Sequence, residues 1–100
     1  YTTFSDLDQA RAFADALLTA RLAACVNAIP GMRALYRWEG ALRDDAEVAC
    51  IVKTRPELKA ELLAFAAVHH PYDTPALLWF EADDGGLDFA RWVAAETGAG

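Results

Sequence analysis

Hydrophobic residues in this chain recur with a period of two in some stretches and near 3.6 in others, and the two kinds of stretch alternate along the sequence. Strand spacing is expected at residues 1–4, 22–39, 47–54 and 75–82. Helical spacing is expected at residues 6–21, at residues 58–69 in a helix that must end before Pro71, and at residues 87–96. This order gives two β-α-β units around a central hairpin, which predicts the α+β class. The expected fold is a ferredoxin-like βαββαβ sandwich with an extra C-terminal helix. One domain covers residues 1–100.

Several local signals sharpen this prediction. Residues 22–29 are almost continuously apolar, which is typical of a strand buried on both faces, and Pro30-Gly31 then favours a bulge within one long bent strand. A polar turn is expected from Glu39-Gly40 to Asp44-Asp45. Ser5 is the expected N-cap of the first helix, and Thr54-Arg55-Pro56-Glu57 forms a capping-box pattern ahead of the second. The chain is short at its first strand, residues 1–4, and it is expected to begin partway into that strand.

The apolar content is high for a domain of this size. Hydrophobic residues make up 55% of the 100 positions, whereas a domain of this length buries only roughly 60–70% of the surface that its unfolded chain exposes. The strands also carry apolar residues on both faces, and helices can cover only one of them. We therefore expect self-association, for which a closed symmetric oligomer is the commonest solution.

Charge and composition exclude several classes of function. The net charge is −6, with 9 basic residues scattered among 15 acidic ones, which argues against nucleic acid as a partner. No apolar run is long enough to predict a membrane span, and no secretory signal is recognised. Two cysteines in 100 residues are too few for a disulfide scaffold, so a cytoplasmic location is expected. No phosphate loop, nucleophile elbow or zinc-protease motif occurs, so no catalytic residues and no enzyme activity are predicted.

Several ordered segments together resemble the CutA family of divalent-cation tolerance proteins. The first block is Arg21-Leu22-Ala23-Ala24-Cys25-Val26-Asn27, with Ile29-Pro30-Gly31 and Leu35-Tyr36-Arg37-Trp38-Glu39-Gly40; it is followed by Lys53-Thr54, by His69-His70-Pro71-Tyr72-Asp73-Thr74-Pro75 and by Phe89-Ala90-Arg91-Trp92. The resemblance implies a homotrimer whose sheets pack around a three-fold axis through edge-strand pairing. It also implies a role in tolerance of divalent metals, copper above all.

Three side chains are candidate metal ligands, namely His70, His69 and Cys25, and this donor set suits weakly bound copper or another divalent ion. Each has a structural alternative. Cys25 fits a small buried hydrophobe, and His69 continues the apolar stripe of its helix. Adjacent histidines on a helix point about 100° apart, and this geometry indicates either weak binding or a site completed by another subunit. Some family members carry a cysteine in the first strand where this chain has Thr2, and a site like theirs would lack one ligand.

The resemblance also implies a cleft between subunits. Its candidate lining residues combine aromatic walls with a few charges: Tyr36, Trp38, Glu39, Lys53, Tyr72 and Trp92. The alternative is that Tyr36 and Trp38 anchor the subunit interface. The same cleft carries a second functional hypothesis, a regulatory module that binds a small ligand between subunits in the manner of PII-like trimers.

Overall fold

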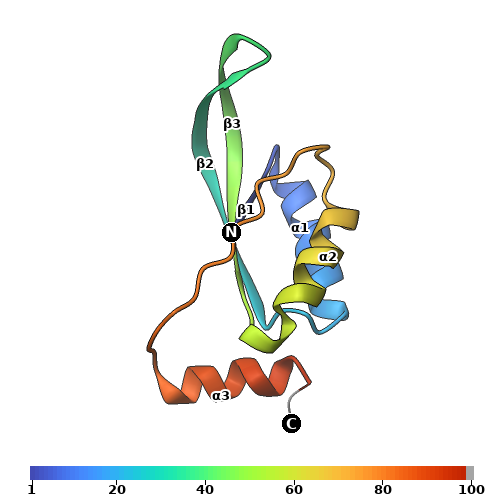
Figure 1. Cartoon of the computed structure of the whole chain (residues 1–100), viewed down its shortest axis with the longest axis vertical. Coiled ribbons are helices and arrows are strands. Elements are labelled where there is room, and N and C mark those ends of the chain that lie inside the picture. Colours follow the sequence, from blue (N-terminus) through green and yellow to red (C-terminus); the bar gives the residue numbers. More distant parts are fainter. Residues whose placement is uncertain (99–100) are drawn as a thin grey trace.

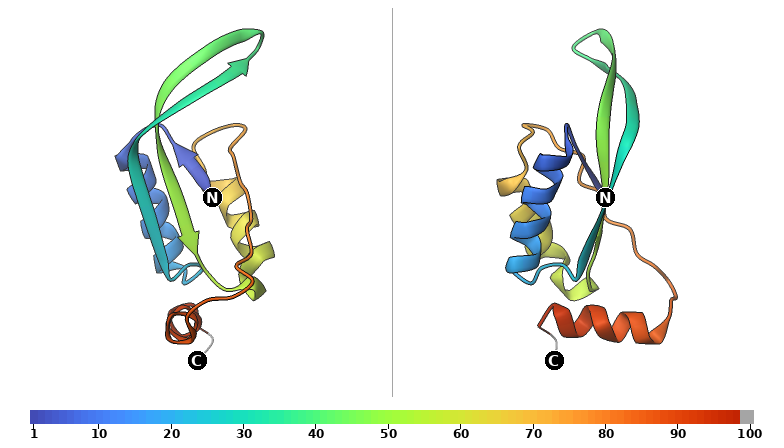
Figure 2. Two further views of the ribbon diagram at one scale, coloured as in Figure 1. Left: turned by 90° about the vertical axis from the view of Figure 1, so that its left-hand side faces the viewer. Right: turned by 180° about the vertical axis from the view of Figure 1, so that it is seen from behind.

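The computed structural model describes residues 1–98, and it confirms the α+β class. The elements in chain order are β1 (Thr2–Phe4), α1 (Leu7–Thr19), β2 (Cys25–Trp38), β3 (Ala41–Lys53), the 3-10 helix η1 (Pro56–Leu58), α2 (Lys59–His69) and α3 (Leu87–Glu96). The strands form an antiparallel sheet in the order β1-β3-β2. Helices α1 and α2 lie side by side on one face of its lower half, and α3 lies beyond its lower end (Figures 1 and 2).

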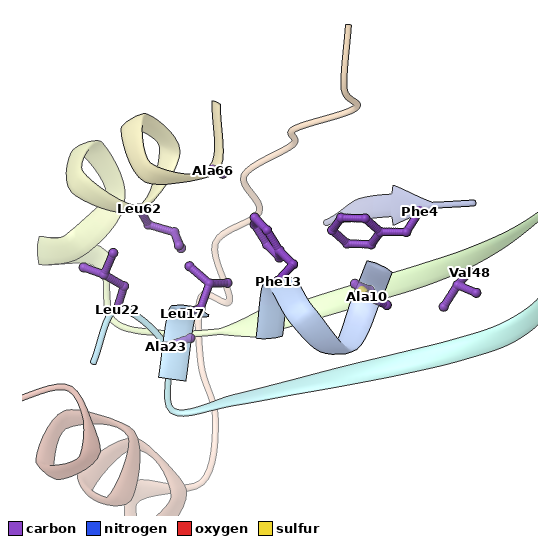
Figure 3. Packing of buried hydrophobic residues seen from close by; sticks show 10 residues of the cluster. Phe4, Ala10, Phe13, Leu17, Leu22, Ala23, Val48, Leu62 and Ala66 are labelled. Carbon is purple, nitrogen blue, oxygen red and sulfur yellow. The ribbon is translucent and has the colours of Figure 1, made fainter. Parts of the chain in front are cut away.

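The core fills the space between this sheet face and the two helices. Phe4 from β1, Leu17 from α1 and Cys50 from β3 are fully buried. Figure 3 shows Phe13 and Leu17 of α1 pointing into the same space as Leu62 of α2. The helical spacing of these residues is what places them on the buried side of each helix. Cys50 is a core residue, because none of its surface is exposed.

The β2–β3 hairpin extends well past the helices (Figure 1). Its predicted bulge is confirmed: the register slips between Ile29 and Met32, where Gly31 has a φ of 86° that a side chain would strain. The predicted turn is wrong in length. Trp38 pairs directly with Ala41, and Glu39 and Gly40 both have positive φ, which is the two-residue turn that matches strand twist. Residues 44 and 45 therefore belong to β3.

The predicted burial of residues 22–29 on both faces is wrong for the single chain. β2 lies at the edge of the sheet, and the chain is exposed from Asn27 to Gly31, with Ile29 49% exposed. A continuously apolar strand is expected where both of its faces are covered. Among the described residues, no element covers the outer edge of β2.

The predicted fourth strand at residues 75–82 does not form a strand in the structure. Leu78 exchanges two backbone hydrogen bonds with Tyr1, at 2.8 and 3.0 Å, and the segment then leaves the sheet (Figure 1). One hydrogen-bonded pair is too little for a ladder. The ferredoxin-like pattern of four strands is thus realised here as three strands and an extended segment beside β1.

Two predicted helix caps are also wrong. Asp6, not Ser5, caps α1 by accepting a hydrogen bond from the backbone N–H of Gln9 at 2.8 Å. The Thr54 hydroxyl donates to the carbonyl of Leu22 at 2.7 Å instead of capping the second helix. The last helix has the predicted bounds, Leu87–Glu96. Among the described helices, none combines the length and the apolar character needed to cross a bilayer.

Candidate functional site

His70 follows the last residue of α2 and is only 7% exposed. Its Nε2 lies 2.9 Å from the carbonyl oxygen of Thr3, and its Nδ1 accepts a hydrogen bond from the backbone N–H of Tyr72 at 3.1 Å. These partners fix the neutral tautomer with the proton on Nε2. Burial lowers the pKa of this imidazole, although its bond to Thr3 acts in the opposite direction. Both ring nitrogens are thus engaged, and a metal ion would have to displace one partner.

His69, the last residue of α2, is exposed. Its ring stacks on Phe65 one turn earlier, with centroids 4.0 Å apart. The predicted apolar stripe therefore holds His69 against its own helix, while the residue as a whole remains exposed. Within residues 1–98, no group of three or more His, Cys, Asp or Glu side chains is placed to hold a metal ion.

Cys25 begins β2 and is half-buried, with a free thiol. It lies opposite Lys53 on β3, whereas Thr3, the partner of His70, lies opposite Ala49. Four residues of strand separate these positions, which is about 13 Å. Cys25 and His70 of one chain therefore do not meet, and the structure separates the predicted metal ligands instead of gathering them.

The six predicted cleft residues also divide among separate places. Trp38 and Glu39 lie at the hairpin tip, and Lys53 lies at the far end of β3, twelve residues after Ala41, the partner of Trp38. That distance along the strand is about 40 Å. Within one chain these residues cannot line one cleft, so a shared cleft requires a second subunit.

The end of β3 carries an aromatic cluster with one cation. The Nζ atom of Lys53 lies 5.6 Å from the ring centroid of Phe89, and the Phe89 and Trp92 rings are 5.7 Å apart. Phe89 is 50% exposed and Trp92 44%. Helix α3 positions both rings, since they are three residues apart on one face. This cluster can take an aromatic or anionic group, and in it Lys53 and Trp92 both lie beside the ring of Phe89.

Tyr36 and Tyr72 each bond to a polar partner that sequence reasoning missed. The Tyr36 hydroxyl donates to Asp45 Oδ2 at 2.6 Å, and this hydrogen bond raises the pKa of Tyr36. The Tyr72 hydroxyl lies 2.8 Å from Ser5 Oγ, and burial raises its pKa. The Tyr36–Asp45 pair follows from the hairpin register, since Tyr36 lies opposite Arg43 and Asp45 is the diagonal neighbour. The Glu39-Gly40 turn signal could have revealed that register.

Thr2, at the position where some family members carry cysteine, is 3% exposed and lies opposite Cys50. Its hydroxyl oxygen is buried, and it has no hydrogen-bond partner among the described residues. A threonine here places a polar group in the core without supplying a soft metal ligand.

Comparison with known proteins gives one family. The family model described as "CutA1 divalent ion tolerance protein" matches residues 1–96. The divalent-cation tolerance protein CutA of Pyrococcus horikoshii is 42% identical over 97 residues, which cover 97% of this chain and 94% of the relative. The chloroplastic protein CutA 1 of Oryza sativa is 33% identical over 97 residues, which cover 97% of this chain and 55% of that longer protein.

Solved structures agree. The crystal structure of CutA1 from Pyrococcus horikoshii has a TM-score of 0.92 at 40% identity, covering 95% of this chain and 92% of that one. The CutA1 of Ehrlichia chaffeensis has a TM-score of 0.93 at 30% identity, covering 96% and 90%. The names of these relatives describe tolerance proteins and not enzymes. This chain belongs to the CutA1 divalent ion tolerance protein family.

Proposed function

We propose that this protein acts as a homotrimer that binds copper or another divalent cation weakly, and that binding rather than catalysis is its activity. The observation that carries the proposal is the open edge of β2 beside exposed apolar side chains. Leu35 is 74% exposed, Leu42 76% and Trp38 48%. An unpaired strand edge with such side chains is a template for pairing with another chain.

Light scattering tests the assembly. We expect a mass about three times the 10.9 kDa of the chain, as the resemblance to CutA proteins implies. Leu42→Lys should shift the protein toward the monomer, because it places a charge on the apolar hairpin. The matched control is Val68→Lys, since Val68 is 78% exposed on α2, away from the hairpin. A wild-type mass near that of one chain would contradict the trimer.

The proposed first metal ligand is His69, with His70 and Cys25 as the other candidates. His69 is exposed, whereas His70 must first lose a hydrogen bond to Thr3 or Tyr72 before it can bind a metal ion. An imidazole suits copper and zinc, and a single protein donor gives weak binding unless another subunit contributes. The separation of Cys25 from His70 makes a shared site within one chain impossible, so a stronger site must lie between subunits.

Copper titration by calorimetry separates these ligands. Wild type, His69→Ala, His70→Ala and Cys25→Ser are compared at one protein concentration. We expect His69→Ala to lose the saturable heat and Cys25→Ser to weaken it only if the site spans subunits. Equal heats in wild type and His69→Ala would contradict this assignment, and the absence of saturation in every protein would contradict direct copper binding.

A second candidate function is sensing of a small ligand in a cleft between subunits. The Lys53–Phe89–Trp92 cluster favours it, because a cation and two exposed rings suit an anionic or aromatic group. A metabolite screen by thermal shift tests it. A ligand that raises the melting temperature of wild type but not of Lys53→Ala supports sensing, whereas an equal rise in both proteins contradicts this site.

A cytoplasmic location is the remaining part of the proposal. Cys25 and Cys50 are both free, and free thiols are typical of reducing compartments. A solved relative from Archaeoglobus fulgidus is named periplasmic. Cell fractionation decides between the two locations, and recovery of the native protein in the periplasm would contradict the proposal.

A further inference from the structure

The sequence contains a single aspartate–glycine step, Asp84-Gly85. It lies in the segment that leads into α3, which begins at Leu87. Residues 83–86 are all exposed. In Figures 1 and 2 this part of the chain runs apart from the sheet and from α1 and α2 before it enters α3. The step is therefore open to solvent and free of the packing that fixes the core.

The side chain of Asp84 is folded back on the amide that follows it. The backbone N–H of Gly85 donates to Asp84 Oδ1 at 2.8 Å. The carboxyl carbon Cγ is one bond from that oxygen, so it lies on the same side of the chain as the Gly85 nitrogen. Rotation of the carboxyl brings Cγ toward the distance of about 3–3.5 Å at which a bond begins to form. Within residues 1–98 no other hydrogen bond or ion pair holds this carboxylate in place.

Glycine at position 85 leaves the nitrogen accessible. A side chain on the residue after an aspartate shields the amide nitrogen, and glycine has none. Apart from chain neighbours, no heavy atom lies within 4 Å of the place where a Cβ would stand on Gly85 or Gly86. The next tie to the fold is the carbonyl of Gly86, which accepts from the N–H of Ala90 at 3.1 Å. The backbone at this step can therefore rearrange with little loss of contacts.

We propose that Asp84 is a modification site, at which the linkage to Gly85 isomerises spontaneously to isoaspartate. The Gly85 nitrogen attacks Cγ of the protonated carboxyl group. A C–N bond forms, and the amide proton leaves with the carboxyl hydroxyl as water, which gives a succinimide ring. Attack of water on the main-chain carbonyl of Asp84 then breaks its bond to Gly85, so that the chain runs through Cγ. One water leaves and one enters, so the mass is unchanged and no oxidant is needed.

The new linkage adds one backbone atom two residues before Leu87 and leaves a carboxylate on the α-carbon of Asp84. The far end of α3 stays tied to the fold, because Arg55 donates to Thr97 Oγ1 at 3.0 Å and Arg21 donates to the carbonyl of Glu96 at 3.3 Å. The exposed α-carboxylate is then a substrate for a carboxyl methyltransferase with a methylsulfonium donor. This inference is independent of the proposed metal binding.

The experiment ages the purified full chain for several weeks in neutral buffer beside Gly85→Ala and Asp84→Glu. Fragment masses of tryptic peptides locate isoaspartate, and methyl transfer from S-adenosylmethionine by an isoaspartyl methyltransferase measures its amount. We expect isoaspartate at residue 84 of the wild type. Gly85→Ala should slow its formation by about tenfold or more, because a methyl group hinders approach to Cγ. The methyl group has room and meets no positive φ, so the fold should tolerate it.

Two further comparisons serve as controls. Asp84→Glu keeps the charge but would have to close a larger ring, so it should form almost no isomer. Asp83 lies in the same exposed stretch and precedes a residue with a side chain, so it should isomerise far more slowly than Asp84. A synthetic peptide of residues 80–91 gives the rate for the unrestrained chain, and the folded protein should react at least as fast.

Three outcomes overturn the proposal. The first is no more isoaspartate at Asp84 than at Asp83. The second is an equal rate in wild type and Gly85→Ala. The third is a folded protein that reacts much more slowly than the peptide, because the fold would then protect the step that it is proposed to expose.

Discussion

The imidazole of His70 lies flat on the ring of Phe4, with centroids 4.5 Å apart and planes inclined by 9°. The same imidazole bonds to Thr3, the neighbour of Phe4, and to Tyr72, two residues further along the chain. One side chain thereby joins the end of α2 and the following segment to β1, elements that are about 67 residues apart in the sequence. The stacked ring and the two hydrogen bonds give His70 a structural role in this fold.

Removal of that side chain should destabilise the protein. We expect His70→Ala to lower the free energy of unfolding by about 2–4 kcal/mol, because it leaves a cavity beside Phe4 and removes the partners of a buried carbonyl and N–H. Urea denaturation at one fixed protein concentration measures the difference, since oligomerisation would otherwise change it.

His69→Ala is the matched control for this measurement. His69 is exposed and contacts its own helix, so the substitution should change the free energy of unfolding by less than about 1 kcal/mol. Equal effects of the two substitutions would show that the contacts of His70 add nothing specific to stability.

The burial of His70 also predicts how stability depends on pH. Its pKa in the folded chain lies below the value of 6.5 that applies when the ring is in water. Between these two values the unfolded chain binds a proton that the folded chain does not, so the contribution to stability is complete above pH 6.5 and is lost as pH falls toward the folded pKa. The slope is at most about 1.4 kcal/mol per pH unit.

Unfolding by urea at pH 7.5 and at pH 5.5 checks this sign in wild type and in His70→Gln. Carboxylates titrate in both proteins, so the difference between them isolates His70. The difference in free energy of unfolding between wild type and variant should shrink at the lower pH. A difference that grows as pH falls would mean that the folded chain holds the protonated ring.

Local signals in the sequence were enough for much of the fold. Pro30-Gly31 predicted the bulge because few residues other than glycine adopt the φ of Gly31, and the bounds of α3 followed from its apolar stripe. Such features depend on neighbouring residues alone. The fourth strand failed because its formation depends on a partner far along the chain, and β1 offers it only the Tyr1 pair.

The candidate site was less predictable for the same reason. The sequence places His69 and His70 side by side, but only tertiary packing decides that one ring is buried against Phe4 and the other remains exposed. Lys53 and Trp92 meet through Phe89, which carries no polar signal of its own. The separation of Cys25 from His70 likewise follows from strand register, which periodicity does not fix.

The start of α1 shows how a choice between adjacent caps is made. Ser5 and Asp6 are both good cap residues, yet the Ser5 hydroxyl is bonded to Tyr72, which leaves the carboxylate of Asp6 to accept from Gln9. We expect Asp6→Ala to lower the free energy of unfolding by about 0.5–2 kcal/mol, as measured by urea denaturation. Asp8→Ala, the same change two residues later in the first turn of α1, is the control. An equal loss there would assign the effect to charge near the helix N-terminus instead of to the cap.

The Tyr36–Asp45 hydrogen bond gives a prediction that does not depend on folding stability. The carboxylate of Asp45 accepts from the Tyr36 hydroxyl and is the main cause of the raised pKa of that phenol. Asp45→Asn removes the negative charge, so the pKa of Tyr36 should fall toward its ordinary value of 10.0. An NMR titration of the Tyr36 ring measures this change. The control is Asp44→Asn, because Asp44 pairs with Arg33, and a fall of the same size there would attribute the raised pKa to the general negative charge of β3.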